Sequence, residues 1–424
     1  MNIPTEDLLH YIWKTKNFDQ LKLTTASGHS LEIIQFGHYN DTDGPDFLQA
    51  QVLIDGVKWV GSIEIHVKSS DWFMHGHSSD SNYENTILHV VYENDREVPR
   101  NDDISTILCL ELKHRISSSI LEVYNQFDQS TWIPCEPQIN NASELAKSLA
   151  KERALSERLE RKWREVAENN SASNNNWEET AYQLLCRSFG LVHNAHSFLE
   201  ISKKVPFSVV KKNADNTLKL EALFYGVAGV LDEPFIDDYG NRLQKEFQFL
   251  KKKYAIEACH ISLNHKAVRP HNFPEIALSQ FISLIRQPSI FSKLMESDLS
   301  QLYRLLKVSA SEYWDDHFSF DKATSFKKKS VGKAKMTIII INALVPFFNF
   351  LSKKLSNERW AKKAHILLEE LPSERNGIIS KWKERGMVAD SAYDSQALLE
   401  LKKNFCEPKR CLSCPIGHHL LKGH

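Results

Sequence analysis

The sequence has few of the features that mark secreted or membrane proteins. Its first residues, MNIPTEDLLHYIW, lack a basic start and a long apolar stretch, so we expect no secretory signal. The most apolar run, 337–348 (TIIIINALVPFF), is shorter than the roughly 20 residues of a membrane span and predicts a buried helix instead. Seven cysteines, an odd number, favour a reducing cytoplasm over structural disulfides.

Several common catalytic motifs are also missing. The sequence shows no P-loop, dinucleotide-binding fingerprint or serine nucleophile elbow, which disfavours ATPases, dinucleotide-dependent enzymes and serine hydrolases. A net charge of −1 means that any basic groove for nucleic acid would have to be local. With 424 residues, 42% of them hydrophobic, the chain is long enough for two domains.

The first third of the chain has the pattern of a helix followed by a sheet. Residues 6–18 place Leu8, Leu9 and Ile12 at helical spacing, and Thr5 is a candidate N-cap. The period then changes to two, and a short helix at 80–85 would interrupt the strands. The predicted strands are LEIIQFG (31–37), FLQAQVLI (47–54), VKWVGSIEIHV (57–67), TILHVVYE (86–93) and STILCLEL (105–112). This mixture predicts an α/β (α+β) core.

The character of the sequence changes after Pro134, where strand patterns nearly vanish. Ser143 can cap a long charged helix to about Glu168, followed by a polar loop at 169–176. Further helical patterns occupy 177–200, 218–230, 240–254, 274–286, 299–307, 337–370, 373–385 and 391–404. We therefore predict a sheet domain over residues 1–135 and an all-α domain over 136–424 that ends in a cysteine-rich segment.

A strand hairpin around Asp55-Gly56 carries the most informative polar residues. A three-residue loop centred on Gly56 would place Asp46 opposite His66, with Glu64 on the same face, whereas a two-residue loop would place Asp46 opposite Ile65. Two converging carboxylates suit Mg²⁺ or Mn²⁺, which can polarise a phosphodiester and activate water. The alternative is a solvated strand face without a chemical role.

This hairpin resembles the core of the PD-(D/E)XK nucleases, in which a Pro-Asp precedes a Glu-x-Lys on the next strand. The resemblance implies a mixed nuclease-like sheet, a metal held by Asp46 and Glu64, and nucleic acid as the partner. It also implies an assisting lysine, but His66 stands at that position and Lys68 follows two residues later. Either His66 or Lys68 could orient water or stabilise charge on the phosphate.

The whole chain also resembles a bacterial family, domain-of-unknown-function family 2851. The segments that carry this resemblance are GPDFLQAQVLIDGVKWVGSIEIHVKSSDW, DSNYENTILHVVYEND, ALFYGVAGVL, RPHNFPEIALSQF and CEPKRCLSCPIG. This second resemblance implies no activity.

Four histidines, His66, His75, His77 and His89, fall within 24 residues of sequence. Imidazole binds zinc, iron and manganese, so the His75-x-His77 pair could serve a metal-dependent oxygenase. The same histidines could instead line a nuclease cleft or contact phosphate. His89 has the pattern of a strand residue with a satisfied hydrogen bond.

Three of the seven cysteines, Cys406, Cys411 and Cys414, lie close together near the end of the chain. A [4Fe–4S] cluster takes four thiolates, and Cys135 is the candidate for the fourth. One distant cysteine followed by three late ones resembles the iron–sulfur staple of some RecB-like nucleases. Zinc held with His418 or His419 and plain reduced thiols are the alternatives. We expect Cys109, Cys186 and Cys259 to be core residues.

Together these features predict a cytoplasmic metal-dependent nuclease that acts on DNA or RNA and does not associate with membranes. Asp46 and Glu64 are its predicted metal ligands. A catalytically inactive nuclease fold that binds nucleic acid or protein is the second hypothesis. A histidine-ligated metal oxidoreductase that uses His75 and His77 is the third.

Overall fold

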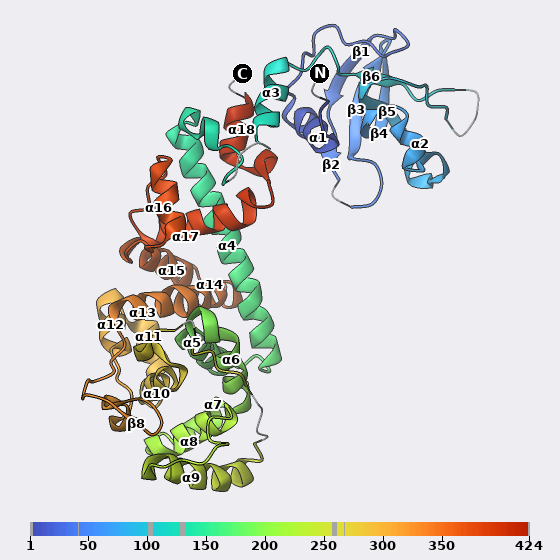
Figure 1. The fold of residues 1–424 in the computed structure, drawn as a ribbon. Helices are drawn as coiled ribbons and strands as arrows, with labels where there is room; N and C mark the ends of the chain where they lie inside the picture. Colours follow the sequence, from blue (N-terminus) through green and yellow to red (C-terminus); the bar gives the residue numbers. More distant parts are fainter. Residues whose placement is uncertain are drawn as a thin grey trace. The chain divides into compact units, whose positions relative to one another are not determined.

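The computed structural model describes residues 3–40, 42–100, 105–127, 132–256, 261–266 and 268–422. The chain forms two compact units (Figure 1). The sheet unit comprises Met1–Glu152, Glu384–Met387 and Glu400–His424, and the helical unit comprises Arg153–Lys383 and Val388–Leu399. This division differs from the predicted one at residue 135, because it groups the C-terminal cysteine segment with the sheet.

The first helix, α1 (Glu6–Thr15), forms as its sequence predicts. The Thr5 side chain accepts a hydrogen bond from the Leu8 N–H and so caps the helix, which confirms the predicted N-cap. The helix ends where Lys16 adopts a left-handed conformation, with φ 58°. Its apolar side chains, including Ile12 and Trp13, are buried, and α1 packs against the central strand β4.

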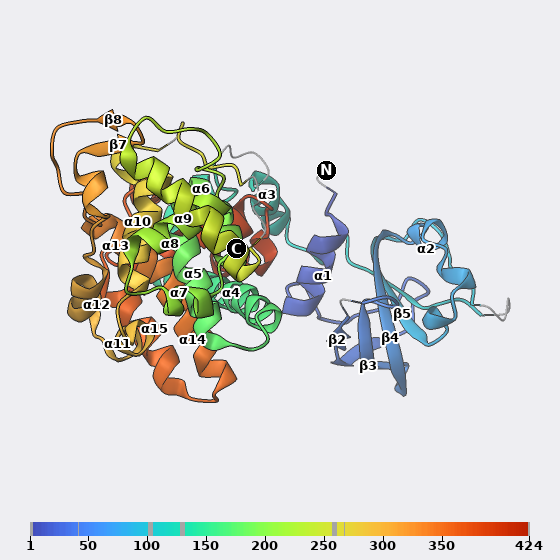
Figure 2. The same ribbon diagram turned by 90° about the horizontal axis from the view of Figure 1, so that it is seen from below.

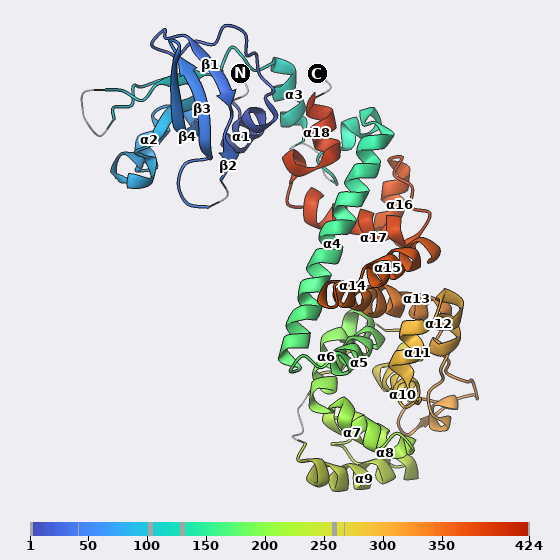
Figure 3. The same cartoon turned by 180° about the vertical axis from the view of Figure 1, so that it is seen from behind.

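The sheet unit contains a curled mixed sheet with the strand order β1-β3-β4-β5-β6, and the two-residue strand β2 also pairs with β3 (Figures 1 and 3). The strands are β1 (Leu31–Gln35), β2 (His38–Tyr39), β3 (Phe47–Ile54), β4 (Val57–Lys68), β5 (Thr86–Glu93) and β6 (Cys109–Glu111). The five predicted strands are confirmed. The sequence did not predict β2, because two residues are too few to show a period.

β4 changes the sheet from antiparallel to parallel pairing. It pairs antiparallel with β3 and parallel with β5, which in turn pairs parallel with β6. A parallel connection needs a crossover, and this one consists of helix α2 (Asp71–Met74) and the 3-10 turns η1 (His77–Ser79) and η2 (Ser81–Tyr83) (Figure 2). The predicted helical piece at 80–85 corresponds to η2.

The β3–β4 hairpin corrects the predicted register. Its loop has two residues, since Ile54 pairs with Val57, so the predicted three-residue loop is wrong. Both loop residues have positive φ, 50° at Asp55 and 80° at Gly56, as a type I′ turn requires. A β-bulge then shifts the register by one residue between Phe47 and Ala50, and within it Gln49 has φ 58°.

The bulge decides which residue lies opposite Asp46. The turn alone would align Asp46 with Ile65, on the wrong face for a carboxylate pair. Beyond the bulge Phe47 pairs with Ile63, so the next position places Asp46 opposite Glu64. The two carboxylates therefore meet, although neither of the loop lengths considered from the sequence predicts this pairing.

The remaining elements of the sheet unit come from two parts of the chain, residues 118–141 and residues 402–422. They are α3 (Ser118–Gln126), the 3-10 helix η3 (Glu136–Asn141), the π-helical turn η7 (Lys402–Cys406), the 3-10 turn η8 (Cys411–Ser413) and α18 (Pro415–Lys422). Helix α18 packs against α3, η3 and η8. The Tyr11 hydroxyl lies 2.7 Å from His418 Nδ1, which connects α18 to the first helix.

The helical unit consists mainly of helices, as its sequence predicts, and its described residues also form one small two-stranded sheet. Its helices are α5 (Trp177–Phe189), α6 (Leu191–Lys204), α7 (Phe207–Lys212), α8 (Thr217–Val227), α9 (Asp238–Tyr254), α10 (Pro274–Ile285), α11 (Ile290–Glu296), α12 (Leu299–Leu306), α13 (Lys333–Ile339), the π-helix η6 (Ile340–Leu344), α14 (Val345–Lys354), α15 (Glu358–Glu370), α16 (Gly377–Glu384) and α17 (Ala392–Leu401). The long helix α4 (Glu144–Ala172) begins in the sheet unit. It extends four residues beyond the predicted end at Glu168.

The helical unit differs from the sequence predictions in two further places. The single helix expected over 337–370 ends at Lys354, and α15 starts again at Glu358. Strands β7 (His317–Ser319) and β8 (Lys322–Ala323) were not predicted. Lys333–Lys354 is long and apolar enough to cross a membrane by composition, but 72% of its most apolar window is buried, as in the core helices of soluble proteins.

Candidate metal centre

Asp46 and Glu64 form a carboxylate pair at the point where β3 begins. The Asp46 backbone N–H donates a hydrogen bond to Glu64 Oε2 at 3.1 Å. In return, the Ile65 N–H donates to Asp46 Oδ2 at 2.9 Å. Glu64 is 5% exposed, because β4 lies inside the sheet and is covered on both faces. The reading of this strand face as solvated is therefore wrong for Glu64.

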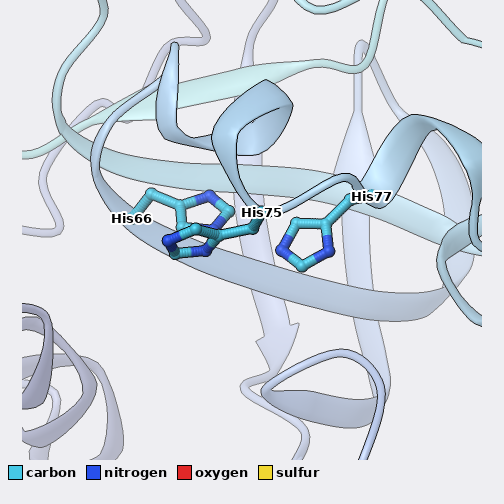
Figure 4. Close-up of side chains that lie close together, drawn as sticks. All are labelled: His66, His75 and His77. Atoms are coloured by element: carbon cyan, nitrogen blue, oxygen red, sulfur yellow. The ribbon is translucent and has the colours of Figure 1, made fainter.

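Three histidines gather beside this pair (Figure 4). His66 belongs to β4, His75 follows α2, and His77 begins η1. One ring nitrogen from each of the three lies within 4.8 Å of the other two. Gly76 separates the last two histidines and has φ 75°, a conformation that costs little for glycine and lets the chain turn between the two side chains.

The carboxylates and the imidazoles form one cluster. Glu64 Oε1 lies 3.2 Å from His77 Nε2 and 3.5 Å from His66 Nε2. Helix α1 adds His10, whose Nε2 lies 3.1 Å from Asp46 Oδ2. We call this set the carboxylate–histidine cluster, and its members are Asp46, Glu64, His10, His66, His75 and His77.

The donor atoms of the cluster fit a divalent metal ion. Nε2 of His10 and Nε2 of His77 are buried, and they lie 3.1 Å from Asp46 Oδ2 and 3.2 Å from Glu64 Oε1. Two carboxylates together with several imidazoles suit manganese, zinc or iron.

The electrostatics of the cluster agree with this donor set. Burial, together with the neighbouring imidazoles, lowers the pKa of His66 to about 2. Burial likewise lowers the pKa of His89 to about 3. Burial raises the pKa of Glu64, and the charge of Asp46 acts in the same direction. Neutral imidazoles are the form that binds metals, and a cation would offset the penalty of burying two carboxylates.

His10 differs from the buried histidines. Burial alone would lower its pKa, but the contact with Asp46 and the charges of Asp46 and Glu6 outweigh burial and raise the pKa. Burial raises the pKa of Glu6, which also interacts with His10 and Asp46. Glu6 and His10 are four residues apart and so share one face of α1. The sequence analysis did not identify Glu6 and His10 as site residues. Their spacing of four was the signal in the sequence that could have indicated them.

A second layer of side chains holds the histidines in place. His66 Nδ1 lies 2.8 Å from Nε2 of His89 on β5, and His66 Nε2 lies 3.0 Å from His75 Nδ1. The ring of His77 stacks on that of Tyr83 at 3.8 Å, and Trp72 packs against both His77 and His89. Such partners orient metal ligands in known sites.

The structure brings together three of the four predicted hairpin residues. Asp46, Glu64 and His66 lie in the cluster, whereas Lys68 is exposed and its charge acts on Glu93 of the neighbouring strand. His75 and His77, considered from the sequence as oxygenase ligands or cleft residues, belong to the same cluster.

The predicted cysteine ligands lie within the sheet unit. The thiol of Cys406 interacts with those of Cys135, Cys411 and Cys414. Cys186 is buried as predicted, Cys109 is only partly buried, and Cys259 lies outside the described residues.

The fold and the cluster together define a mixed α/β protein with a carboxylate–histidine cluster and a long helical region. The sequence profile of the family described as protein of unknown function (DUF2851) matches residues 6–377. The chain belongs to this family. The match includes the whole cluster but stops before Cys406, so the resemblance noted for CEPKRCLSCPIG lies outside it. Comparison with curated proteins and with solved structures gave no significant match.

Proposed function

We propose that the chain is a divalent-metal-dependent nuclease that hydrolyses phosphodiester bonds at the carboxylate–histidine cluster. The observation that carries this proposal is the pairing of Asp46 with Glu64 across the β3–β4 hairpin. Acidic side chains on two adjacent strands are the metal ligands of the PD-(D/E)XK nucleases that the hairpin resembles. The element order also supports the proposal, since α1 precedes the hairpin and α2 leads into the parallel strand β5.

Asp46 and Glu64 would hold the ion together with His77, whose Nε2 lies 3.2 Å from Glu64 Oε1. Of Mg²⁺ and Mn²⁺, Mn²⁺ suits this set better, since magnesium prefers oxygen ligands alone. A bound ion polarises the phosphodiester and lowers the pKa of an attacking water molecule.

The other members of the cluster would handle protons and charge. His66, whose pKa is lowered to about 2 by burial, stays neutral and lies 3.0 Å from His75 Nδ1 through its Nε2. The exposed His75 is the imidazole that would pass protons from the cluster to solvent. His10, whose pKa is raised, would supply positive charge near Asp46. An assisting lysine supplies that charge in the PD-(D/E)XK nucleases that the hairpin resembles.

A cavity next to the cluster supports nucleic acid as the substrate. Its volume is about 250 Å³, and Trp72, His77, Tyr83 and Arg100 are among the residues that line it. Arginine binds phosphate, and the partly exposed Arg100 gives this lining the chemistry for a phosphate group beside the metal ligands.

A histidine-ligated oxidoreductase is the second candidate. It is favoured by one observation, namely that three imidazoles and the Glu64 carboxylate form a ligand set that also suits non-haem iron. This candidate requires iron bound in the cluster of the isolated protein, and a His75→Ala variant should lose that iron.

The test compares the wild type with Glu64→Gln and with the matched control Glu93→Gln. Glu93 is also a carboxylate of the sheet, but it pairs with Lys113 outside the cluster. Anaerobically purified proteins are incubated with labelled single- and double-stranded DNA and RNA in Mn²⁺ or Mg²⁺. We expect cleavage by the wild type and by Glu93→Gln, and a loss of more than about 100-fold in Glu64→Gln, beyond the usual effect of an outer-shell residue.

Other results would contradict the proposal. Equal cleavage by Glu64→Gln would show a contaminating nuclease. Absence of cleavage in every condition, with nucleic-acid binding retained by all three proteins, would favour the inactive interaction module.

A further inference from the structure

Four cysteines converge in the sheet unit, away from any role in the proposed nuclease chemistry. Cys135 immediately precedes η3, Cys406 ends η7, Cys411 begins η8, and Cys414 immediately precedes α18. Cys135, Cys411 and Cys414 are each less than one tenth exposed, and Cys406 is partly buried. Cys135, Cys406 and Cys411 are free thiols.

The four thiols face a common region. The thiol of Cys135 interacts with those of Cys411 and Cys414, and the thiol of Cys406 interacts with all three others. Helix α18, which follows Cys414, packs against η3 and η8, the elements that adjoin Cys135 and Cys411.

The backbone around the last three cysteines is tightly arranged. The Cys414 N–H donates to the Cys411 carbonyl at 3.1 Å, and the His418 N–H donates to the Cys414 carbonyl at 2.8 Å. Gly417 lies directly against this loop, since a Cβ atom there would stand 2.2 Å from the Cys411 carbonyl oxygen. Helix α18 can therefore reach the cysteine loop only because residue 417 has no side chain.

The segment that carries Cys135 is held to the C-terminal segment by further contacts. Arg385 Nε donates to Glu136 Oε1 at 2.8 Å, and the Arg385 guanidinium lies 4.3 Å from the centre of the Trp132 ring. Lys402, which precedes Cys406 by one helical turn, lies 5.9 Å from the same ring. These contacts fix Cys135 beside cysteines that follow it by more than 270 positions in the sequence.

We propose that Cys135, Cys406, Cys411 and Cys414 bind a [4Fe–4S] cluster that joins the segment before η3 to the segment before helix α18. Each thiol loses its proton as its sulfur binds one iron. Lys402 and Lys409 lie close enough to Cys406 and Cys411 to act on their charge, and they complement the negative charge of four thiolates.

One observation favours the iron–sulfur cluster over zinc. Tetrahedral zinc with bonds of about 2.3 Å brings its sulfur ligands within about 3.8 Å of one another. Among the described residues, His66, His75 and His77 bring three ligand atoms within 4.8 Å of one another. The sulfur atoms of the four cysteines do not form such a group of three. A wider ring of four thiolates suits a cluster of several metal ions.

The first experiment measures iron, sulfide and zinc in the full chain purified without oxygen. We expect about four iron and four sulfide ions per chain, with a visible absorption that dithionite bleaches. The Cys411→Ser variant should lose most of this iron, whereas the matched control Cys109→Ser should keep it, since Cys109 lies on β6 outside the cysteine group. Circular dichroism verifies that both variants fold.

Three outcomes would overturn the proposal. They are one zinc ion per chain without iron, no bound metal in the wild type, and equal loss of iron in Cys109→Ser and Cys411→Ser. The Glu64→Gln variant should retain the iron–sulfur cluster whether or not it cleaves nucleic acid, so the test is independent of the proposed nuclease activity.

Discussion

The buried histidines predict that the metal-free sheet unit loses stability below neutral pH. In the folded protein burial lowers the pKa of His66 to about 2 and that of His89 to about 3. Both imidazoles are buried completely and pair with each other through His66 Nδ1 and His89 Nε2. In the unfolded chain each would titrate near pH 6.5.

The sign and size of the effect follow from these values. Below pH 6.5 the unfolded chain binds protons that the folded chain excludes, so stability falls as the pH falls through 6.5 and continues to fall towards the folded pKa values. Between pH 7.5 and pH 5 each histidine accounts for a loss of about 2 kcal/mol, and the two together for about 4 kcal/mol. The raised pKa of Glu64 acts in the opposite direction and reduces the net loss.

A variant isolates the histidine contribution from that of Glu64. In His89→Gln the amide oxygen can still accept from His66, but residue 89 no longer titrates. The matched control is His29→Gln, which removes an exposed histidine that pairs with Asp55 outside the cluster.

Hydrogen exchange at the β5 amides of chelator-treated protein gives the opening free energy at both pH values. We expect His89→Gln to lose about half of the pH dependence and His29→Gln to lose none. A wild type equally stable at both pH values, or an unchanged pH dependence in His89→Gln, would refute the reasoning.

Four further predictions concern the two candidate metal sites. Chelation followed by dialysis should abolish nuclease activity and added Mn²⁺ should restore it, as measured with labelled DNA; activity that survives chelation would exclude a metal mechanism. His10→Ala should lower turnover at least about tenfold, whereas Lys68→Ala should leave it within about twofold, because His10 contacts Asp46 and the exposed Lys68 instead acts on Glu93. The reverse order in a cleavage assay would restore the catalytic role to Lys68. Gly76→Ala should destabilise the protein by about 1 kcal/mol, the cost of a left-handed conformation for alanine, because φ at this residue is 75° and no atom would clash with the added Cβ. The same variant should bind Mn²⁺ more weakly in calorimetry. Unchanged affinity would show that the turn does not position His75 and His77. Gly417→Ala should lower the iron content per chain, because the Cβ atom of the alanine would stand 2.2 Å from the Cys411 carbonyl oxygen. Full iron occupancy would contradict the close packing of α18 against the segment that contains Cys411.

The hairpin shows how far sequence patterns reach and where they fail. Alternation along 57–67 correctly placed Glu64 and His66 on one face of a strand, because side-chain direction is a local property of extended backbone. The partner of Asp46 was predicted incorrectly, because it depends on a bulge at Gln49. The left-handed φ of 58° at a glutamine leaves no recognisable mark in the sequence.

Burial within the cluster was equally hard to predict. Glu64-x-His66 is the pattern of a half-exposed strand, yet both residues are buried because β4 has α1, α2 and neighbouring strands packed around it. His10 comes from a helix whose pattern indicates only an apolar face. Its approach to Asp46 depends on how α1 packs against the sheet, which is a contact between residues 36 positions apart.

By itself the sequence determined the kinds of elements and their order: a capped first helix, the main strands of one sheet and a long helical region. It also supplied the candidate ligands, namely two carboxylates, a group of histidines and four cysteines. Only the tertiary structure decided that Asp46 meets Glu64, that His10 joins them and Lys68 does not, and that Cys135 lies beside the C-terminal cysteines. The reason is physical: propensity and periodicity act over a few residues, whereas these contacts depend on a bulge, on helix packing and on the closure of long stretches of chain.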